Sequence, residues 1–394
     1  MLLFDNRAEL RGKPAAHALI FGISSYRYLT SSEMQSFGIY YNSSGAITGY
    51  RIYQWLIDNQ RRLAIPLATC RLLLSPSARE IEAQPELKGL TVPCTLDDFL
   101  LSTNEWRTDA QTNRDNLTLF YFAGNGFELG KSNPVMMLQD FGSGVGPMLR
   151  SSVAVNNLFY GMGPTSRQPD IARTQLYFID TDRAIPKKEF SSFELMNTTA
   201  VFDAEPLGID DRNAAVFYAS TAGGVAYALE GSATLFSMAL LRCLDGKAAV
   251  PGEVGPEGSV RWYVSTTSLV GGLMDTLNEL NREAGAHQTF EVGGQVRNSI
   301  IRYLDEPPPV DVLIEIHPVE ALPVSHVEVR NEEGTIVLKP AVPLDPHPYR
   351  VELPGGYYTL SVKIDPPHPS FADAHTRVRL ATPPRAVWKV RVIS

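Results

Sequence analysis

Two short apolar stretches, each ending in a polar cluster, most constrain what this chain can fold into. Residues 116–126 read NLTLFYFAGNG and residues 174–183 read TQLYFIDTDR. An apolar run of about four to six residues bounded by turn signals is typical of a buried strand in a parallel sheet. In an open α/β sheet, ligands and chemistry collect just beyond the carboxyl ends of such strands. The clusters 124–126 (Gly-Asn-Gly) and 180–183 (Asp-Thr-Asp-Arg) therefore form the candidate site.

Other stretches have the same strand pattern, and helical patterns separate them. We predict strands over 17–23, 68–74, 117–122, 175–179 and 214–220. Residues 46–57 place apolar side chains at helical spacing, and Thr95 followed by Asp98 is close to a capping box that begins another helix. The connections between strands are long enough for right-handed crossovers, so we expect an α/β domain with one mainly parallel sheet and helices on both faces.

The pattern changes after the proline run at residues 307–309. Short segments with partial period-two alternation follow, separated by turn signals such as NEEG and PGG, and this is typical of an all-β sandwich. No disulfide or Trp–Cys signature of a true antibody domain is present. The expected organisation is an α/β domain over 1–305, a Pro-rich linker over 306–310, and an immunoglobulin-like or similar β-sandwich over 311–394.

Charge and composition narrow the classes of function. The formal net charge of −8 argues against a general nucleic-acid partner. No apolar run reaches the roughly 18 residues of a membrane-spanning helix, and the N-terminus lacks the apolar core of a secretory signal. The three cysteines are widely spaced and odd in number, which favours reduced thiols. We expect a cytoplasmic protein with no membrane association, no metal site and no cofactor.

The two polar clusters resemble motifs of the caspase-like cysteine peptidases (the caspase, metacaspase and paracaspase superfamily). In that family one strand ends in Gly-His-Gly and the next in Asp-Ala-Cys-Arg or a close variant. The resemblance covers roughly residues 15–304, and it implies a three-layer sandwich around a mainly parallel sheet. It places Asn125 where the general-base histidine belongs and Asp182 where the nucleophilic cysteine belongs. It also assigns the oxyanion frame to the backbone N–H groups of Gly126 and Asp182.

The residues at these positions do not support thiol chemistry. A carboxamide such as that of Asn125 cannot accept and return a proton near neutral pH, and Asp182 is a poor acyl acceptor. Asp182 would also put negative charge where an oxyanion should develop. None of the seven histidines or three cysteines follows a central strand at its carboxyl end. The simplest role for Asp182 is a solvated carboxylate or one paired with Arg183, and a divalent ion between Asp180, Asp182 and a third carboxylate is an alternative.

The sequence therefore predicts a caspase-like pseudoprotease. It would act as a scaffold, a regulator or a substrate of an active protease, with a protein partner or peptide-like segment at the strand ends. The resemblance also suggests a bacterial defence or cell-death context. Three alternatives stay open: an active cysteine endopeptidase represented by an inactivated variant, a hydrolase that uses other residues, and a structural module whose sandwich does the binding.

Overall fold

The computed structural model describes most of the 394 residues. The residues outside the description are 37, 40, 130–132, 145–148, 167, 187–197, 203–209, 229–230, 255–259, 376–377 and 394. The chain divides into two compact units, one formed by Met1–Leu241 with Leu277–Ile301 and the other by Arg242–Thr276 with Arg302–Ser394. The expected domain boundaries at 305 and 311 stay a prediction.

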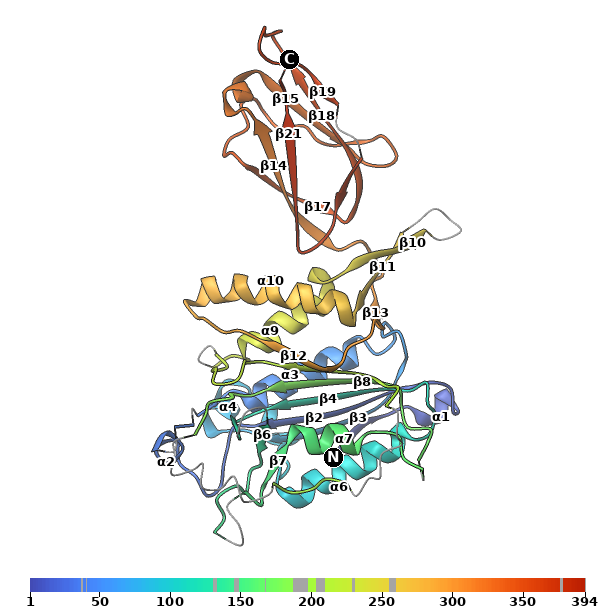
Figure 1. Ribbon diagram of the computed structural model, residues 1–394, viewed down its shortest axis with the longest axis vertical. Coiled ribbons are helices and arrows are strands. Elements are labelled where there is room, and N and C mark those ends of the chain that lie inside the picture. The colour runs from blue at the N-terminus through green and yellow to red at the C-terminus, as the bar shows by residue number, and fades with distance from the viewer. Residues whose placement is uncertain are drawn as a thin grey trace. The chain divides into compact units, whose positions relative to one another are not determined.

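The first unit is built around a seven-stranded sheet (Figure 1). Its strands lie in the order β1 (Leu2–Asp5), β3 (Leu67–Ser75), β2 (Ala16–Ile23), β4 (Leu117–Ala123), β8 (Thr174–Asp180), β9 (Asn213–Tyr218) and β12 (Glu291–Gln295). The five central strands run parallel, and β1 and β12 pair antiparallel at the two edges. Every residue of β2, β3, β4 and β9 is buried, as expected where helices cover both faces of a parallel sheet.

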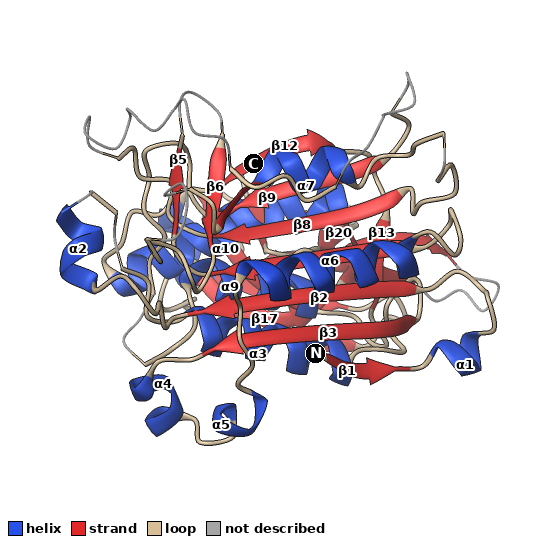
Figure 2. Ribbon diagram, turned by 90° about the horizontal axis from the view of Figure 1, so that it is seen from below, coloured by secondary structure: helices blue, strands red, loops and turns tan. Residues whose placement is uncertain are grey.

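Helices cover both faces of this sheet. Figures 1 and 2 show α3 (Gly45–Asp58) on one face and α6 (Leu96–Ala110) with α7 (Val155–Gly161) on the other. The predicted capping box begins α6, because the Asp98 carboxylate accepts from the Thr95 backbone N–H at 3.2 Å and the Thr95 hydroxyl accepts from the Asp98 N–H. The other α-helices among the described residues are α1 (Arg7–Leu10), α2 (Ser31–Ser36), α4 (Ala78–Ala83), α5 (Leu87–Leu90), α9 (Leu235–Arg242) and α10 (Thr266–Ala284).

A small antiparallel sheet follows β4 directly. It consists of β5 (Gly126–Glu128), β6 (Pro134–Met137) and β7 (Ser152–Ala154). The sequence analysis did not predict this sheet, and β5 is a three-residue strand too brief to leave a pattern in the sequence. Gly126 pairs with Met136 in this sheet, and the Met137 N–H donates to the Asn125 carbonyl at 3.1 Å, so the sheet holds the backbone of Asn125 in place.

The second unit contains the C-terminal β structure. One of its sheets has the strand order β17 (Tyr349–Pro354), β14 (Pro309–His317), β21 (Arg385–Arg391). A second sheet has the order β16 (Ile336–Leu338), β15 (Ser325–Arg330), β18 (Gly356–Ile364), β19 (Ala374–His375), and β20 (Arg379–Ala381) also pairs with β18. Alternate residues of β14, β18 and β21 point into one shared core, as in a sandwich. A third sheet has the order β10 (Val250–Val254), β11 (Val260–Ser265), β13 (Ile300–Tyr303), and η2 (Cys243–Lys247) and η3 (Val319–Val324) are short helical turns.

The predicted fold class is confirmed: an α/β fold with a mainly parallel central sheet and an additional all-β part at the C-terminus. The edge strands β1, β12 and β17 were not expected. In the described part of the chain, no helix has the length and apolar character needed to cross a membrane.

Candidate functional site

The two polar clusters follow neighbouring strands of the central sheet. Strands β4 and β8 pair in parallel register with Ala123 opposite Asp180, so the next residues of each strand emerge at the same carboxyl edge. The backbone N–H of Gly124 donates to the Asp180 carbonyl at 3.3 Å, which continues the ladder into the loops. The site expected at the strand ends is therefore a real meeting point of the two segments.

Asn125 is fully buried and holds a neighbouring loop. Its side-chain Oδ1 accepts a hydrogen bond from the backbone N–H of Asn42 at 2.6 Å. Its own backbone N–H donates to the Tyr26 hydroxyl at 2.7 Å. The amide nitrogen Nδ2 has no partner among the described residues. Asn125 therefore ties the segment that follows β2 to the end of β4.

Asp182 is also buried, at 2% exposure, so the expectation of a solvated carboxylate is wrong. Its Oδ1 accepts from the backbone N–H of Ala226 at 2.5 Å. Burial raises the pKa of Asp182 to about 7, the Ala226 N–H opposes that rise, and the nearby carboxyl of Asp180 adds to it. No cation pairs with Asp182 among the described residues, so burial keeps this carboxyl partly protonated near neutral pH.

Asp180 lies at the end of β8 among hydroxyl groups. Its Oδ2 accepts from the Tyr121 hydroxyl at 2.7 Å and from the Thr234 hydroxyl, and its Oδ1 has no partner among the described residues. Burial raises the pKa of Asp180 to about 6, while the two hydroxyl donors oppose that rise. Across the described residues, no three His, Cys, Asp or Glu side chains are arranged to hold a metal ion.

Arg183 turns away from Asp182 and joins two other carboxylates, so the expected pairing with Asp182 is wrong. Its Nε donates to Glu128 at 2.8 Å and its Nη1 to Glu291 at 2.5 Å. The guanidinium also lies over the Tyr218 ring, 4.7 Å from its centre. Glu128 and Glu291 belong to the unexpected strands β5 and β12, so no local pattern indicated this network.

The glycines around Asn125 are required by close packing. A Cβ atom on Gly126 would lie 2.7 Å from the Val135 carbonyl oxygen and 2.8 Å from the side chain of Thr181. A Cβ atom on Gly124 would lie 3.0 Å from the Tyr26 hydroxyl. Only glycine allows the two strand-end segments to approach this closely. The oxyanion frame at Gly126 and Asp182 itself stays a prediction.

Thiols and imidazoles lie elsewhere. All three cysteines are buried and free, and burial raises the pKa of Cys70 and of Cys243 to about 12 and that of Cys94 further. His17 is the second residue of β2, toward the amino end of the sheet. The described residues include every histidine and cysteine of the chain, and none of these side chains is hydrogen-bonded to Asn125 or Asp182. The contacts supplied by Tyr26, Asn42, Ala226 and Thr234 were missed by the sequence analysis because their segments are far from the two clusters in the chain. The contact of Tyr121 was missed because its partner, Asp180, lies 59 residues further along.

Comparisons with known proteins give remote similarities only. No protein-family model and no curated protein matches the sequence. A structural-genomics protein of Geobacter sulfurreducens matches with a TM-score of 0.42 and 11% identity, over 73% of this chain and 95% of that one. Caspase-1 of Spodoptera frugiperda matches with a TM-score of 0.39 and 12% identity, over 73% of this chain and 89% of that one. Similarity at this level assigns neither a family nor an activity to the chain.

Proposed function

We propose that this chain is a caspase-like protein without peptidase activity, which acts by binding a protein partner at the carboxyl edge of its sheet. One observation carries the proposal. The two positions that the motif resemblance assigns to base and nucleophile hold Asn125 and Asp182, and each is buried and hydrogen-bonded to the backbone of another loop. Both side chains serve as anchors for loops rather than as groups open to a substrate.

The chemistry of the two side chains supports inactivity. A peptide-bond nucleophile of this kind needs a thiolate and a base that takes its proton. Asn125 supplies an amide whose oxygen is already occupied by the Asn42 N–H. Asp182 supplies a carboxyl whose ionised form would repel a developing oxyanion.

The anchoring contacts also support a binding role. Asn125 holds Asn42, in the segment after β2, and Asp182 holds Ala226, in the segment after β9. Loops that are held in one conformation lose less entropy on binding, so a peptide-like segment or a partner protease would meet a preorganised edge. The defence or cell-death setting rests on the motif resemblance alone.

The buried carboxyls favour a second candidate function, a hydrolase that uses acid–base chemistry. A carboxyl whose pKa is about 7 lies in the range suited to general acid or base catalysis, and Asp182 has that value. This candidate requires that Asp182 reach a substrate, which means breaking its contact with Ala226.

Hydrolysis assays separate the two candidates. We expect no turnover of a panel of fluorogenic peptides ending in Asp, Arg or Lys, and no labelling of the strand ends by a thiol-directed probe. Turnover that persists through repeated purification and disappears in Asp182→Asn would establish the carboxyl hydrolase and overturn the pseudoprotease. Turnover that disappears with a thiol-directed inhibitor would overturn both candidates.

A further inference from the structure

A chain of hydrogen bonds crosses the carboxyl edge of the central sheet and connects Asp180 to Asn125. It starts at Oδ2 of Asp180, which accepts from the Thr234 hydroxyl. The Thr234 backbone N–H donates to the hydroxyl of Thr48, in the first turn of α3, at 3.1 Å. The Thr48 N–H donates in turn to the Ser44 carbonyl, just before that helix, at 3.0 Å. The chain of bonds thus runs from the end of β8 to the start of α3.

The same chain of bonds continues from α3 to the end of β4. The Ser44 N–H donates to Asn42 Oδ1 at 2.9 Å, and the Asn42 N–H donates to Asn125 Oδ1 at 2.6 Å. A backbone N–H can only donate, so the second bond fixes the orientation of the Asn125 carboxamide, with Nδ2 turned away from Asn42. Asp180 and Asn125 therefore each use one of their two polar side-chain atoms in this chain of bonds.

The other polar atom of each end group is buried and unused. Among the described residues, neither Asn125 Nδ2 nor Asp180 Oδ1 has a hydrogen-bond partner, and both residues are 0% exposed. One of these atoms is a donor and the other is an acceptor. Buried polar atoms without partners are destabilising and rare in native proteins, so a ligand that satisfies both atoms at once would stabilise the fold.

Strand geometry places the two unused atoms on one face of the sheet. Ala123 is opposite Asp180, and the Gly124 N–H donates to the Asp180 carbonyl, so the pairing continues past the end of β4. Since side chains alternate along a strand, Asn125 shares the face of Ala123 and Asp180. A strand spacing of about 4.8 Å and a rise of about 3.3 Å per residue put the Cα atoms of Asn125 and Asp180 about 8 Å apart. Side chains as short as Asn and Asp leave room between them for a single small ligand.

The chemistry of the two atoms selects the ligand. A bare cation would meet the hydrogens of Asn125 Nδ2, and an anion would meet the carboxyl of Asp180. A partner's side chain cannot reach atoms that are buried in the native fold. Water can accept from Nδ2 and donate to Oδ1 at once, as internal waters do for otherwise unsatisfied polar groups. Burial raises the pKa of Asp180 to about 6, and a water that turns round can bond the protonated carboxyl as well.

We propose that an internal water molecule binds between Asn125 and Asp180 and closes the chain of hydrogen bonds into a ring. The water accepts from Asn125 Nδ2 and donates to Asp180 Oδ1. The ring then links the ends of β4 and β8 with the first turn of α3 and with Thr234, which precedes α9. A pseudoprotease and a hydrolase would hold the same water, so this inference does not depend on the activity of the chain.

A high-resolution crystal structure of the full chain tests the position directly. We expect an ordered water within about 2.7–3.2 Å of both Asn125 Nδ2 and Asp180 Oδ1. Crystals grown with rubidium in place of sodium should show no anomalous scattering there. An anomalous peak at this position, a direct bond between the two side chains, another protein atom as the partner of either, or a lack of ordered density between them would overturn the proposal.

Side-chain amide NMR tests the same water in solution. We expect the Asn125 Nδ2 hydrogens to show a nuclear Overhauser cross-peak to a long-lived water. Asn59 is the control, because its buried Nδ2 donates to the Trp55 carbonyl at 2.9 Å and should show no such cross-peak. Equal cross-peaks from the two amides would contradict the proposal.

A matched pair of variants assigns the water to this position. Asp180→Leu removes the acceptor, and we expect the Asn125 cross-peak to disappear. Tyr121→Phe removes a donor to the other carboxyl oxygen, Oδ2, and we expect the cross-peak to remain. A cross-peak of equal size in both variants would show that Asp180 does not hold the water. The crystal structure requires no substitution, so it tests the proposal even if Asp180→Leu fails to fold.

Discussion

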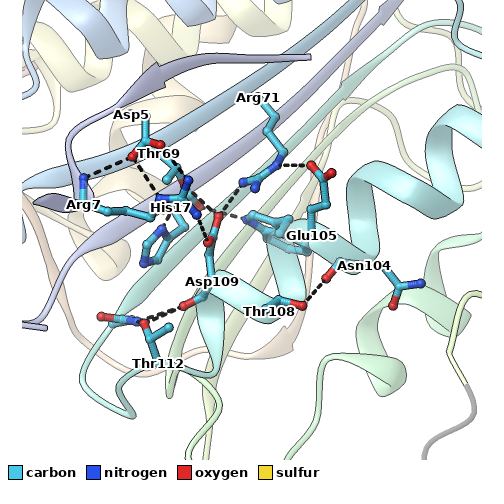
Figure 3. Close-up of polar contacts among 12 residues, drawn as sticks. Asp5, Arg7, His17, Thr69, Arg71, Asn104, Glu105, Thr108, Asp109 and Thr112 are labelled. Atoms are coloured by element: carbon cyan, nitrogen blue, oxygen red, sulfur yellow. Dashed lines mark hydrogen bonds and ion pairs between the residues drawn. The ribbon is translucent and has the colours of Figure 1, made fainter.

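Two polar clusters beside the central sheet each hold a buried carboxyl, and they stabilise it in opposite ways. At the carboxyl edge, the described residues give Asp180 and Asp182 hydroxyl and backbone N–H donors only, and burial raises the pKa of both. Near the amino ends of the strands, Asp109 lies between the guanidiniums of Arg71 and Arg7 at 2.5 and 3.0 Å (Figure 3).

The comparison teaches what a buried acid does when cations are present or absent. A carboxylate between two guanidiniums is a charge-paired cross-link, whereas one among neutral donors keeps a proton that it can lose near neutral pH. The first kind of cluster is suited to stability and the second to function. The predictions that follow test this difference, in order of decreasing effect.

Removing Asp109, the carboxylate between Arg71 and Arg7 near the amino ends of the strands, should cause the largest loss of stability. Asp109→Ala leaves the buried Arg71 with only the half-exposed Glu105, so we expect a loss of about 3 kcal/mol in the free energy of unfolding, measured by urea denaturation. Glu105→Ala is the control, with an expected loss of about 1 kcal/mol or less. Equal losses in the two variants would show that burial of the pair contributes nothing.

Rebuilding the catalytic pair should have the next largest effect. We expect Asn125→His combined with Asp182→Cys to produce weak hydrolysis of fluorogenic peptides, about a hundredfold above either single variant, because nucleophile and base act as a unit. The unmodified protein sets the background. Single variants as active as the double one would contradict the assignment of these two positions to one catalytic pair.

The pH dependence of stability should separate the two clusters by sign. Native Asp182 has a pKa of about 7 against 3.8 ordinarily, so between these values the native state keeps a proton that the unfolded state has lost. The free energy of unfolding contributed by this group therefore falls as pH rises through that window, by up to about 1.4 kcal/mol per pH unit. Asp182→Asn should gain stability relative to the unmodified protein over the same range.

His17 should give the free energy of unfolding a pH dependence of the opposite sign. Burial lowers its pKa to about 4, and its ring Nδ1 lies 2.9 Å from the Thr69 hydroxyl. Between about 4 and the ordinary 6.5 the unfolded state binds more protons, so its contribution to stability rises with pH. His17→Asn should lose that rise. The same pH slope in both variants, measured by urea denaturation from pH 4 to 7, would contradict the comparison.

The smallest effect should come from single hydroxyl groups. Tyr121→Phe removes one donor to Asp180, and Thr69→Val removes the hydroxyl between His17 and Asp109. We expect each to cost about 1 kcal/mol in the free energy of unfolding. Only Tyr121→Phe should raise the pKa of Asp180 further, which carboxyl-labelled NMR titration would detect. An unchanged titration would mean that this hydroxyl does not stabilise the ionised form.

Much of the central fold was predictable because its signals are local. The apolar run at 117–122 is bounded by its own turn residues, and Thr95 with Asp98 begins α6 through contacts within one helical turn. The edge strands β1 and β12 were not predictable, because they are only four and five residues long and have no distinctive alternation of apolar and polar residues. Strand β12 also contains two glycines. Their pairing depends on a neighbour that is already in place.

The sequence by itself determined that Asn125 and Asp182 follow neighbouring strands and that neither thiol nor imidazole accompanies them. Only the tertiary structure decided what these side chains do. Asn125 meets Asn42 across 83 residues of sequence, and Asp182 meets Ala226 across 44. It also turned Arg183 toward Glu128 and Glu291, so that within the described part of the chain no cation pairs with the buried Asp182. Protonation and hydrogen-bond partners depend on what burial brings together, and residue order along the chain does not encode that locally.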